Sequence, residues 1–279
     1  MPNVLDFQFE GMRLKYIEKG SGRPLLLFHA NGFSAGSYDP LTDHLVNRGF
    51  HVHALNFMGH GGSDSTTDFH NWEFFGRQAA AFADHLGYER FFAVGHSIGG
   101  ASLLLATPAM GNRLLAGALL DPTVFSPLTS RFASFIPNPL AALAEKRRRE
   151  FKDLRVVSRS FRMNPLFKQW HPASFQGYLE TAFEATNAGY RLCLDPKIEA
   201  KIFRSFHAGQ WRVFRTVKKP FLIITAHKSE VTPDSAVKNL LKSHAKSRWI
   251  KHSGTHCFPM EDPEGVGREI AQFFDVQES

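Results

Sequence analysis

Apolar runs of strand length alternate with helix-forming segments along much of this chain, and this alternation limits the possible folds more than any other feature. The run Pro24–His29 is continuously apolar up to its last residue, as a strand buried on both faces requires. It is followed by helical patterns at 41–48 and 72–86 and by strand patterns at 50–56 and 91–94. Such an alternation builds a parallel sheet covered by helices on both faces. We therefore expect an α/β fold.

The same patterns continue on either side of this region. Residues 4–10 and 12–18 read as two short strands joined at Gly11, which predicts an antiparallel entry to the sheet. Further strands are expected at 115–121, 220–225 and 247–251, with helices at 101–106, 235–244 and 264–274. Ligands of such sheets bind at the carboxyl ends of the strands, so the residues that follow each strand are the first candidates for a site.

The alternation stops after Asp121 and resumes at Pro220. The segment between them is helical in pattern and rich in Phe, Arg and Trp, which predicts a core formed by residues 1–121 and 219–279 and an inserted helical cap at 122–218. This cap carries 17 Lys and Arg against 7 Asp and Glu, a net charge of +10, which leaves the rest of the chain at −3. Its densest basic run, Lys146–Arg149, is expected to be a solvated helix face, with an anionic partner as the alternative.

The composition is that of a soluble globular protein, with 43% hydrophobic and 21% charged residues. No stretch approaches the ~20 apolar residues of a membrane span, so we expect a cytoplasmic protein without one. Because the basic charge is confined to one segment, no nucleic acid is expected as a partner. The two cysteines, Cys193 and Cys257, are too few for a disulfide framework and show no metal spacing.

One turn in the sequence contains a candidate catalytic residue. Gly95-His96-Ser97-Ile98-Gly99 lies directly between the strand pattern at 91–94 and the next helix. This GxSxG arrangement is a nucleophile elbow, in which a tight turn exposes the serine hydroxyl above the sheet. The flanking glycines are needed because a Cβ at their positions would clash with the neighbouring backbone. We expect Ser97 to be a nucleophile.

A serine hydroxyl needs a base within hydrogen-bond reach and an acid that orients the base. Among the 14 histidines, His256 follows the last expected strand, on a loop at the edge of the sheet where Ser97 lies. We expect His256 to be the base, with His252 as a weaker candidate.

Four motifs along the chain resemble those of the α/β-hydrolase superfamily. They are Phe28-His29-Ala30-Asn31-Gly32-Phe33, similar to the HGxx loop; Met58-Gly59-His60-Gly61-Gly62-Ser63-Asp64, similar to RGHGxSD; the GHSxGG elbow; and Gly254-Thr255-His256 through Pro263, similar to GHxxxxExPE. Ala30 stands where the family usually has Gly, and Met58 where it has Arg. The resemblance spans essentially the whole chain and implies a mostly parallel eight-stranded sheet with helices on both faces.

The resemblance also completes the expected site. A tetrahedral intermediate needs two backbone N–H donors for its oxyanion. The residue after the nucleophile, Ile98, supplies one, and the resemblance assigns the other to Asn31. A plain turn at Asn31-Gly32 is the alternative.

The acid is left open by the sequence. The family commonly places an Asp after the strand that follows the cap, but here Ser229 stands at that position and Glu230 is one residue away. Asp121 ends an earlier strand, where some members carry the acid. We favour Asp121, with Glu230 as the alternative and Asp234 as a more remote one.

The aromatic residues of the cap, which include 11 Phe with Trp170 and Trp211, favour an apolar acyl or alkyl group in the substrate. No GxGxxG, HExxH or CxxC pattern is present, so we expect neither a cofactor nor a metal. The leading prediction is a carboxylic-ester hydrolase, as monomer or homodimer. A C–C bond hydrolase, an acyl or thioester transferase, and a non-catalytic ligand receptor of the same fold remain as alternatives.

Overall fold

The computed structural model describes residues 3–125, 138–207, 209–243 and 246–278. Its centre is an eight-stranded sheet in the order β1-β2-β4-β3-β5-β6-β10-β11. The strands are β1 (Asn3–Phe9), β2 (Met12–Gly20), β3 (Arg23–Phe28), β4 (Phe50–Leu55), β5 (Phe91–His96), β6 (Leu114–Leu120), β10 (Phe221–Ala226) and β11 (Arg248–His252). β2 pairs antiparallel with β1 and with β4, and all other pairs are parallel. The expected mostly parallel α/β sheet is confirmed.

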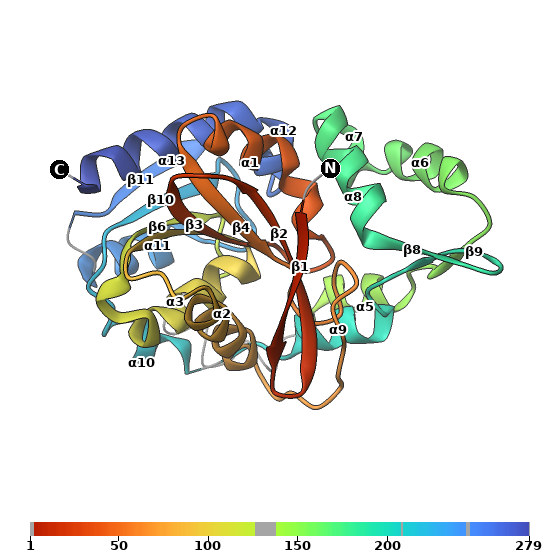
Figure 1. Ribbon diagram of the computed structural model, residues 1–279, viewed down its shortest axis with the longest axis horizontal. Helices are drawn as coiled ribbons and strands as arrows, with labels where there is room; N and C mark the ends of the chain where they lie inside the picture. The colour runs from red at the N-terminus through yellow and green to blue at the C-terminus, as the bar shows by residue number, and fades with distance from the viewer. Residues whose placement is uncertain (1–2, 126–137, 208, 244–245, 279) are drawn as a thin grey trace.

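Helices cover both faces of this sheet, as Figure 1 shows. They are α1 (Asp39–Val46) and α13 (Pro263–Glu278) on one face, and α2 (Glu73–Leu86), α3 (Ile98–Met110) and α11 (Asp234–Ser243) on the other. Leu25 and Leu27 of β3 pack in the core beneath α1 and α13. The intervening Leu26 packs in the core beneath α2 and α3, because successive strand residues point to opposite faces. Burial on both faces explains why this strand is apolar without interruption.

The core elements expected from the sequence are found at their positions, except that His244 lies outside the described residues. Three short helical segments were not expected: η1 (Ala35–Tyr38), η2 (Gly111–Arg113) and α12 (Phe258–Glu261). Each is too short to show an apolar period in the sequence. Two of them, η1 and α12, flank the loops that carry the candidate site.

The segment 122–218 contains helices, but it is not purely helical as expected. Residues 126–137 of it lie outside the description. The described part holds α5 (Pro139–Glu145), α6 (Leu154–Met163), α7 (Pro165–Lys168), α8 (Pro172–Ala182), α9 (Pro196–Arg204) and α10 (Gln210–Phe214). It also holds a three-stranded antiparallel sheet of β7 (Glu150–Phe151), β9 (Gly189–Leu192) and β8 (Phe183–Thr186). These strands have two to four residues, too few for a strand pattern to be recognised in the sequence.

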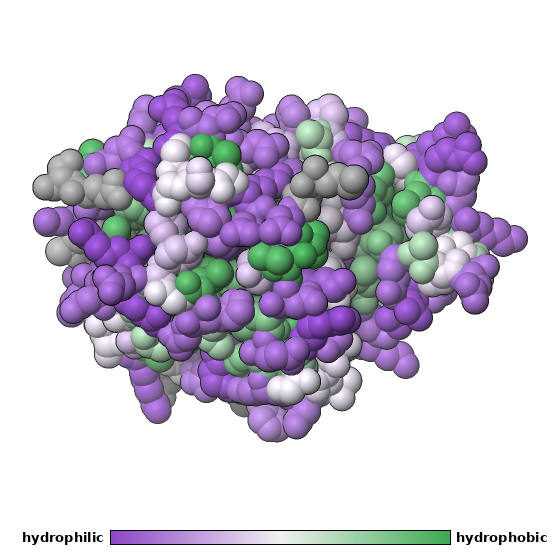
Figure 2. Space-filling model, in the orientation of Figure 1, coloured by the Kyte–Doolittle hydropathy of each residue, from purple (hydrophilic) through white to green (hydrophobic). Residues whose placement is uncertain are grey.

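The face of the molecule in Figure 2 is mainly hydrophilic, with small separate apolar areas. Within the four described ranges of the chain, no helix is both long and apolar enough to cross a membrane.

Candidate active site

Ser97 lies on the sharp turn between β5 and α3. Its backbone has φ 55° and ψ −118°, a conformation that L-residues rarely adopt and that requires support from the surrounding structure. Two glycines make room for the turn. A Cβ on Gly99 would lie 2.2 Å from the carbonyl oxygen of Phe28, and one on Gly95 would lie 2.5 Å from that of Gly99. Glycine is therefore needed at both positions, as the sequence pattern indicates.

Asp121 and His256 lie together at the edge of the sheet where Ser97 lies. The Nδ1 atom of His256 lies 2.7 Å from Oδ2 of Asp121, whose side chain is fully buried. The other carboxylate oxygen accepts the Ala226 backbone N–H at 3.3 Å, from the end of β10. The structure thus brings His256 together with Asp121, while Glu230 is exposed on the loop after β10.

The loop after β10, which carries Glu230, also contacts the segment next to Asp121. Ser229, at the position where the family commonly has Asp, accepts the backbone N–H groups of Val231 and Thr232 with its hydroxyl. The Thr232 hydroxyl in turn donates to the backbone oxygen of Pro122, directly after Asp121. This hydrogen bond holds the loop against the segment that carries Asp121.

Thr123 is a site residue that the sequence analysis missed. Its Oγ1 atom lies 3.1 Å from Oγ of Ser97, and its backbone N–H donates to the Ser97 carbonyl at 3.0 Å. The Ser97 hydroxyl therefore rests against Thr123 in this conformation. The position just after the strand that ends at Asp121 was the only signal in the sequence that pointed to it.

The loop after β3 places Asn31 between two anchored residues. The Ala30 N–H donates to the Tyr38 hydroxyl at 3.0 Å, and the Gly32 N–H donates to Nε2 of His60 at 3.1 Å. The intervening Asn31 N–H has no acceptor among the described residues. Ile98 opens α3, and the first N–H groups of a helix lack partners within it. Both positions expected to donate to an oxyanion thus carry available N–H groups.

Two buried histidines hold this loop in place. His29 accepts the Phe57 N–H on Nε2 at 3.0 Å, and its Nδ1–H donates to the Ala30 oxygen at 2.8 Å. His60 accepts from Gly32 and donates from Nδ1 to the Met58 oxygen at 3.0 Å. Burial lowers the pKa of His29 well below its ordinary value, and burial lowers the pKa of His60 to about 4. Both rings are therefore neutral at pH 7, the form that can both accept and donate.

A third buried histidine, His96, connects the base to the same loop. Its Nε2–H donates to the backbone oxygen of His256 at 2.9 Å, and its Nδ1 accepts the Tyr38 O–H at 2.6 Å. Burial, followed by the neighbouring His256, lowers the pKa of His96 well below its ordinary value. Since Tyr38 also accepts the Ala30 N–H, one chain of hydrogen bonds runs from the Asn31 loop to the loop of His256.

The basic run Lys146–Arg149 of segment 122–218 also contacts the Asn31 loop. Arg147 binds both carboxylate oxygens of the buried Glu199, at 2.7 and 2.6 Å, and donates to the Tyr178 hydroxyl at 2.9 Å. The Glu199 carboxylate lies against Gly32, and its backbone oxygen accepts from the Asn31 side chain at 3.2 Å. Burial opposes the charge of Arg147, but the Tyr178 and Glu199 groups raise its pKa above the ordinary value.

The expectation of a solvated helix face at Lys146–Arg149 is therefore wrong. Helix α5 ends at Glu145, and Lys146 caps it. Arg147, which is partly exposed, pairs with the buried Glu199, and Arg149 pairs with Asp195 at 2.7 Å. Residues of opposite charge that are distant in the sequence neutralise half of this run, which a local charge pattern does not reveal.

The described aromatic residues of segment 122–218 mainly pack against one another, and those at 126–137 lie outside the description. Trp170 lies 4.9 Å from Phe167, between ring centroids, and 4.9 Å from Phe33 of the Asn31 loop. Trp211 is buried in the core beneath α3 and donates its indole N–H to the Phe125 oxygen at 2.8 Å. Packing within the cap and onto the core therefore accounts for these residues.

The other sequence candidates have different partners. Nε2 of His252 lies 3.1 Å from Oδ2 of Asp262, and Asp234 pairs with Lys251 at 2.8 Å. Cys193 and Cys257 are both free thiols, and burial raises the pKa of Cys257 to about 12.

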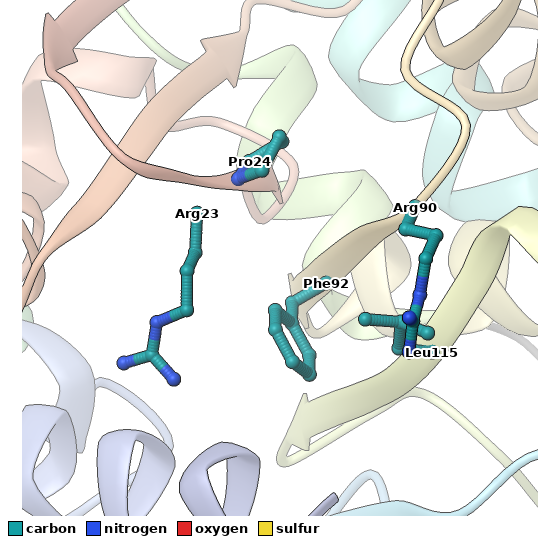
Figure 3. A pocket seen from close by; sticks show the side chains of 5 residues that line it. All are labelled: Arg23, Pro24, Arg90, Phe92 and Leu115. Atoms are coloured by element: carbon teal, nitrogen blue, oxygen red, sulfur yellow. The ribbon is translucent and has the colours of Figure 1, made fainter. Parts of the chain in front are cut away.

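One surface pocket of about 290 Å³ lies at the opposite edge of the sheet (Figure 3). It is lined by Arg23, Pro24, Arg90, Phe92 and Leu115, at or next to the amino ends of β3, β5 and β6. Ser97 and Asp121 follow the carboxyl ends of β5 and β6, so this pocket is separate from the candidate active site.

Comparison with known proteins identifies the family of this chain. The model of the alpha/beta hydrolase family matches residues 25–269, and the chain belongs to this family. It is a hydrolase of the α/β-hydrolase fold, as the sequence motifs predicted.

Individual relatives are distant. A non-heme haloperoxidase of Rhodococcus erythropolis is 33% identical over 111 residues, which is 40% of this chain and 40% of that protein. A serine hydrolase-like protein of Danio rerio is 24% identical over 92% of this chain and 82% of its own. The crystal structure of an E-2-(acetamidomethylene)succinate hydrolase superposes with a TM-score of 0.84, at 19% identity, over 99% of this chain and 100% of that one. The last similarity concerns the fold alone.

Proposed function

We propose that this α/β hydrolase cleaves carboxylic esters through Ser97, His256 and Asp121. The observation that carries the proposal is the 2.7 Å hydrogen bond between His256 Nδ1 and the fully buried Asp121, at the edge of the sheet where the partly exposed Ser97 lies on its turn. This bond fixes Nδ1 as the protonated ring nitrogen, so that Nε2 carries the lone pair of a general base. The arrangement supports Asp121 over Glu230 as the acid.

The reaction follows from these positions. The Ser97 hydroxyl turns from Thr123 to Nε2 of His256, gives up its proton and attacks the ester carbonyl. The Asn31 and Ile98 N–H groups stabilise the oxyanion of the tetrahedral intermediate. His256 then protonates the leaving alcohol, and an acyl-enzyme on Ser97 remains. Water, activated by His256, attacks this acyl group and releases the acid with regeneration of Ser97.

Apolar residues next to Ser97 support an apolar acyl or alkyl group in the substrate. Ile98 follows the nucleophile and Val124 follows Thr123, and both belong to one apolar cluster with Leu194 and Ile198 of the cap. We therefore assign residues 122–218 as a cap over the core of 1–121 and 219–279, with α9 in contact with the Asn31 loop.

One polar group in this region is available to a substrate. The side-chain oxygen of Asn31 is buried and has no hydrogen-bond partner among the described residues. An unpaired buried acceptor costs free energy, so a substrate that donates a hydrogen bond to it gains affinity. A hydroxyl or amide N–H near the ester group would supply such a donor.

The experiment is a series of p-nitrophenyl esters of increasing acyl length, with labelling by a fluorophosphonate probe. We expect turnover and labelling in the wild type and neither in Ser97→Ala, with kcat lowered by about 10⁴-fold or more. Ser102→Ala is a matched control, since this serine is buried one turn further along α3. Labelling of Ser97→Ala at the wild-type rate would refute the assignment, and labelling without turnover of any ester would refute ester cleavage as the activity.

A further inference from the structure

Two histidines and a glutamate gather on the antiparallel side of the sheet. His51 and His53 lie on β4, and Glu18 lies on the neighbouring β2, directly opposite His53 in the register. Residues two apart on a strand share a face, and directly opposed residues share it too. All three side chains therefore point to one face of the sheet, although Glu18 and His51 are 33 residues apart in the sequence.

Tyr88, just after α2, links the two histidine rings. Nε2 of His51 lies 2.9 Å from Oε1 of Glu18, and Nδ1 of His51 lies 3.1 Å from the Tyr88 hydroxyl. The same hydroxyl lies 3.0 Å from Nε2 of His53. The ring centroids of His51 and His53 are 4.3 Å apart.

One nitrogen of this group has no partner. Nδ1 of His53 is buried and forms no hydrogen bond with any described residue. The Tyr88 hydroxyl lies at the other ring nitrogen, Nε2, so it does not change this. His53 is 2% exposed, so this nitrogen is also shielded from water. A neutral imidazole keeps a lone pair on one ring nitrogen, and this is the form of histidine that binds metal ions.

The charges around the group are compatible with a cation. Lys19 is adjacent in the sequence, but its ammonium group binds Asp39 and Asp43 at 2.9 and 3.0 Å. Glu18 and His51 line a hollow that is open to solvent, which provides a path of entry.

We propose that Glu18, His51 and His53 bind a divalent first-row transition metal ion, with Zn²⁺ as the best match to two imidazoles and one carboxylate. One ligand atom from each residue can be chosen so that all three lie within 4.8 Å of one another. Ligand distances of about 2.0–2.2 Å are then reached by small side-chain rotations. The Tyr88 hydroxyl or a water molecule completes the coordination.

Such an ion would be structural, since its ligands are not those of the Ser97 site. It would join β2 to β4, the antiparallel strands beside the parallel part of the sheet. The sequence carries no local motif for this site, because these ligands meet only through strand pairing.

The test uses protein freed of metal by a chelator and titrated with Zn²⁺ alone. We expect one Zn²⁺ per chain by calorimetry, a rise in Tm with Zn²⁺ concentration, and visible absorption bands when Co²⁺ is used instead. Glu18→Gln and His51→Gln should each weaken binding at least about tenfold and abolish the rise in Tm. Both side chains are partly exposed, so these variants are expected to fold, which circular dichroism checks.

His70→Gln is the matched control, because His70 is an exposed histidine elsewhere on the chain. It should bind Zn²⁺ like the wild type. The proposal is overturned if wild-type protein binds no Zn²⁺, if both Glu18→Gln and His51→Gln bind it with unchanged affinity, or if His70→Gln loses binding to the same extent.

Discussion

The ring of His96 donates a hydrogen bond to the backbone oxygen of His256 at 2.9 Å, and its other nitrogen accepts the Tyr38 hydroxyl at 2.6 Å. Because Tyr38 also accepts the Ala30 N–H, the loop that carries the base and the loop that carries Asn31 are held by the same buried side chains. The relative position of base and oxyanion donors therefore depends on residues that touch no substrate.

Tyr38→Phe should lower kcat about tenfold and leave KM nearly unchanged. The variant keeps the ring but removes the hydroxyl, so the Ala30 N–H and Nδ1 of His96 lose their partner, at a cost of about 1–3 kcal/mol in the free energy of unfolding. Steady-state kinetics with a p-nitrophenyl ester and urea denaturation measure both effects. Tyr190→Phe on β9 is the control. A Tyr38→Phe enzyme with unchanged kcat would show that this chain of hydrogen bonds has no role in positioning.

Asp121→Asn should lower kcat by about 10²–10⁴-fold, since the amide cannot stabilise the imidazolium that forms on His256. Glu230→Gln, on an exposed loop, should leave kcat within about twofold of the wild type. The two substitutions make the same chemical change at the two candidate acids. The greater loss in Glu230→Gln would reverse the assignment of the acid.

Arg147→Met should destabilise the protein by about 2–4 kcal/mol, because it leaves the buried Glu199 carboxylate without its partner next to Gly32. The double variant Arg147→Met with Glu199→Gln should recover part of this loss, since no unpaired charge then remains buried. Arg148→Met, at an exposed neighbour in the same run, serves as the control and should cost less than about 1 kcal/mol. Chemical denaturation followed by tryptophan fluorescence gives the three values.

Stability should fall as the pH is lowered from about 6.5 towards 4. The pKa of His60 is about 4 in the folded chain, against an ordinary value of 6.5. Between these values the unfolded chain binds a proton that the folded chain does not, so the free energy of unfolding decreases as pH decreases. For one such histidine the loss between pH 7.5 and 5 is about 2 kcal/mol.

The variant His60→Gln tests whether His60 causes this pH dependence of stability. In this variant the difference in unfolding free energy between pH 7.5 and pH 5 should shrink by about 2 kcal/mol. The same difference should be unchanged in His70→Gln, whose side chain is exposed. If the pH dependence of the unfolding free energy stays the same in His60→Gln, other titratable groups cause it.

Much of the core was predictable from local sequence because its determinants are local. The continuous apolar runs of β3, β5 and β10 reflect burial on both faces of a parallel sheet, and Gly95 and Gly99 reflect steric limits within a single turn. The short strands β7, β8 and β9 were missed because they are too brief to show a period.

Asn31 was assigned by the resemblance to the α/β-hydrolase superfamily. The sequence by itself determined the sheet, the turn of Ser97 and the candidate positions of His256 and Ile98. Each is set by residue types that are adjacent in the chain, where strand periodicity and turn sterics act. Only the tertiary structure decided which carboxylate faces His256, that Arg147 is paired inside the protein, and that Glu18 lies opposite His53. These relationships join segments that are distant in sequence, and the side-chain distances that fix them arise only when strands and loops pack together.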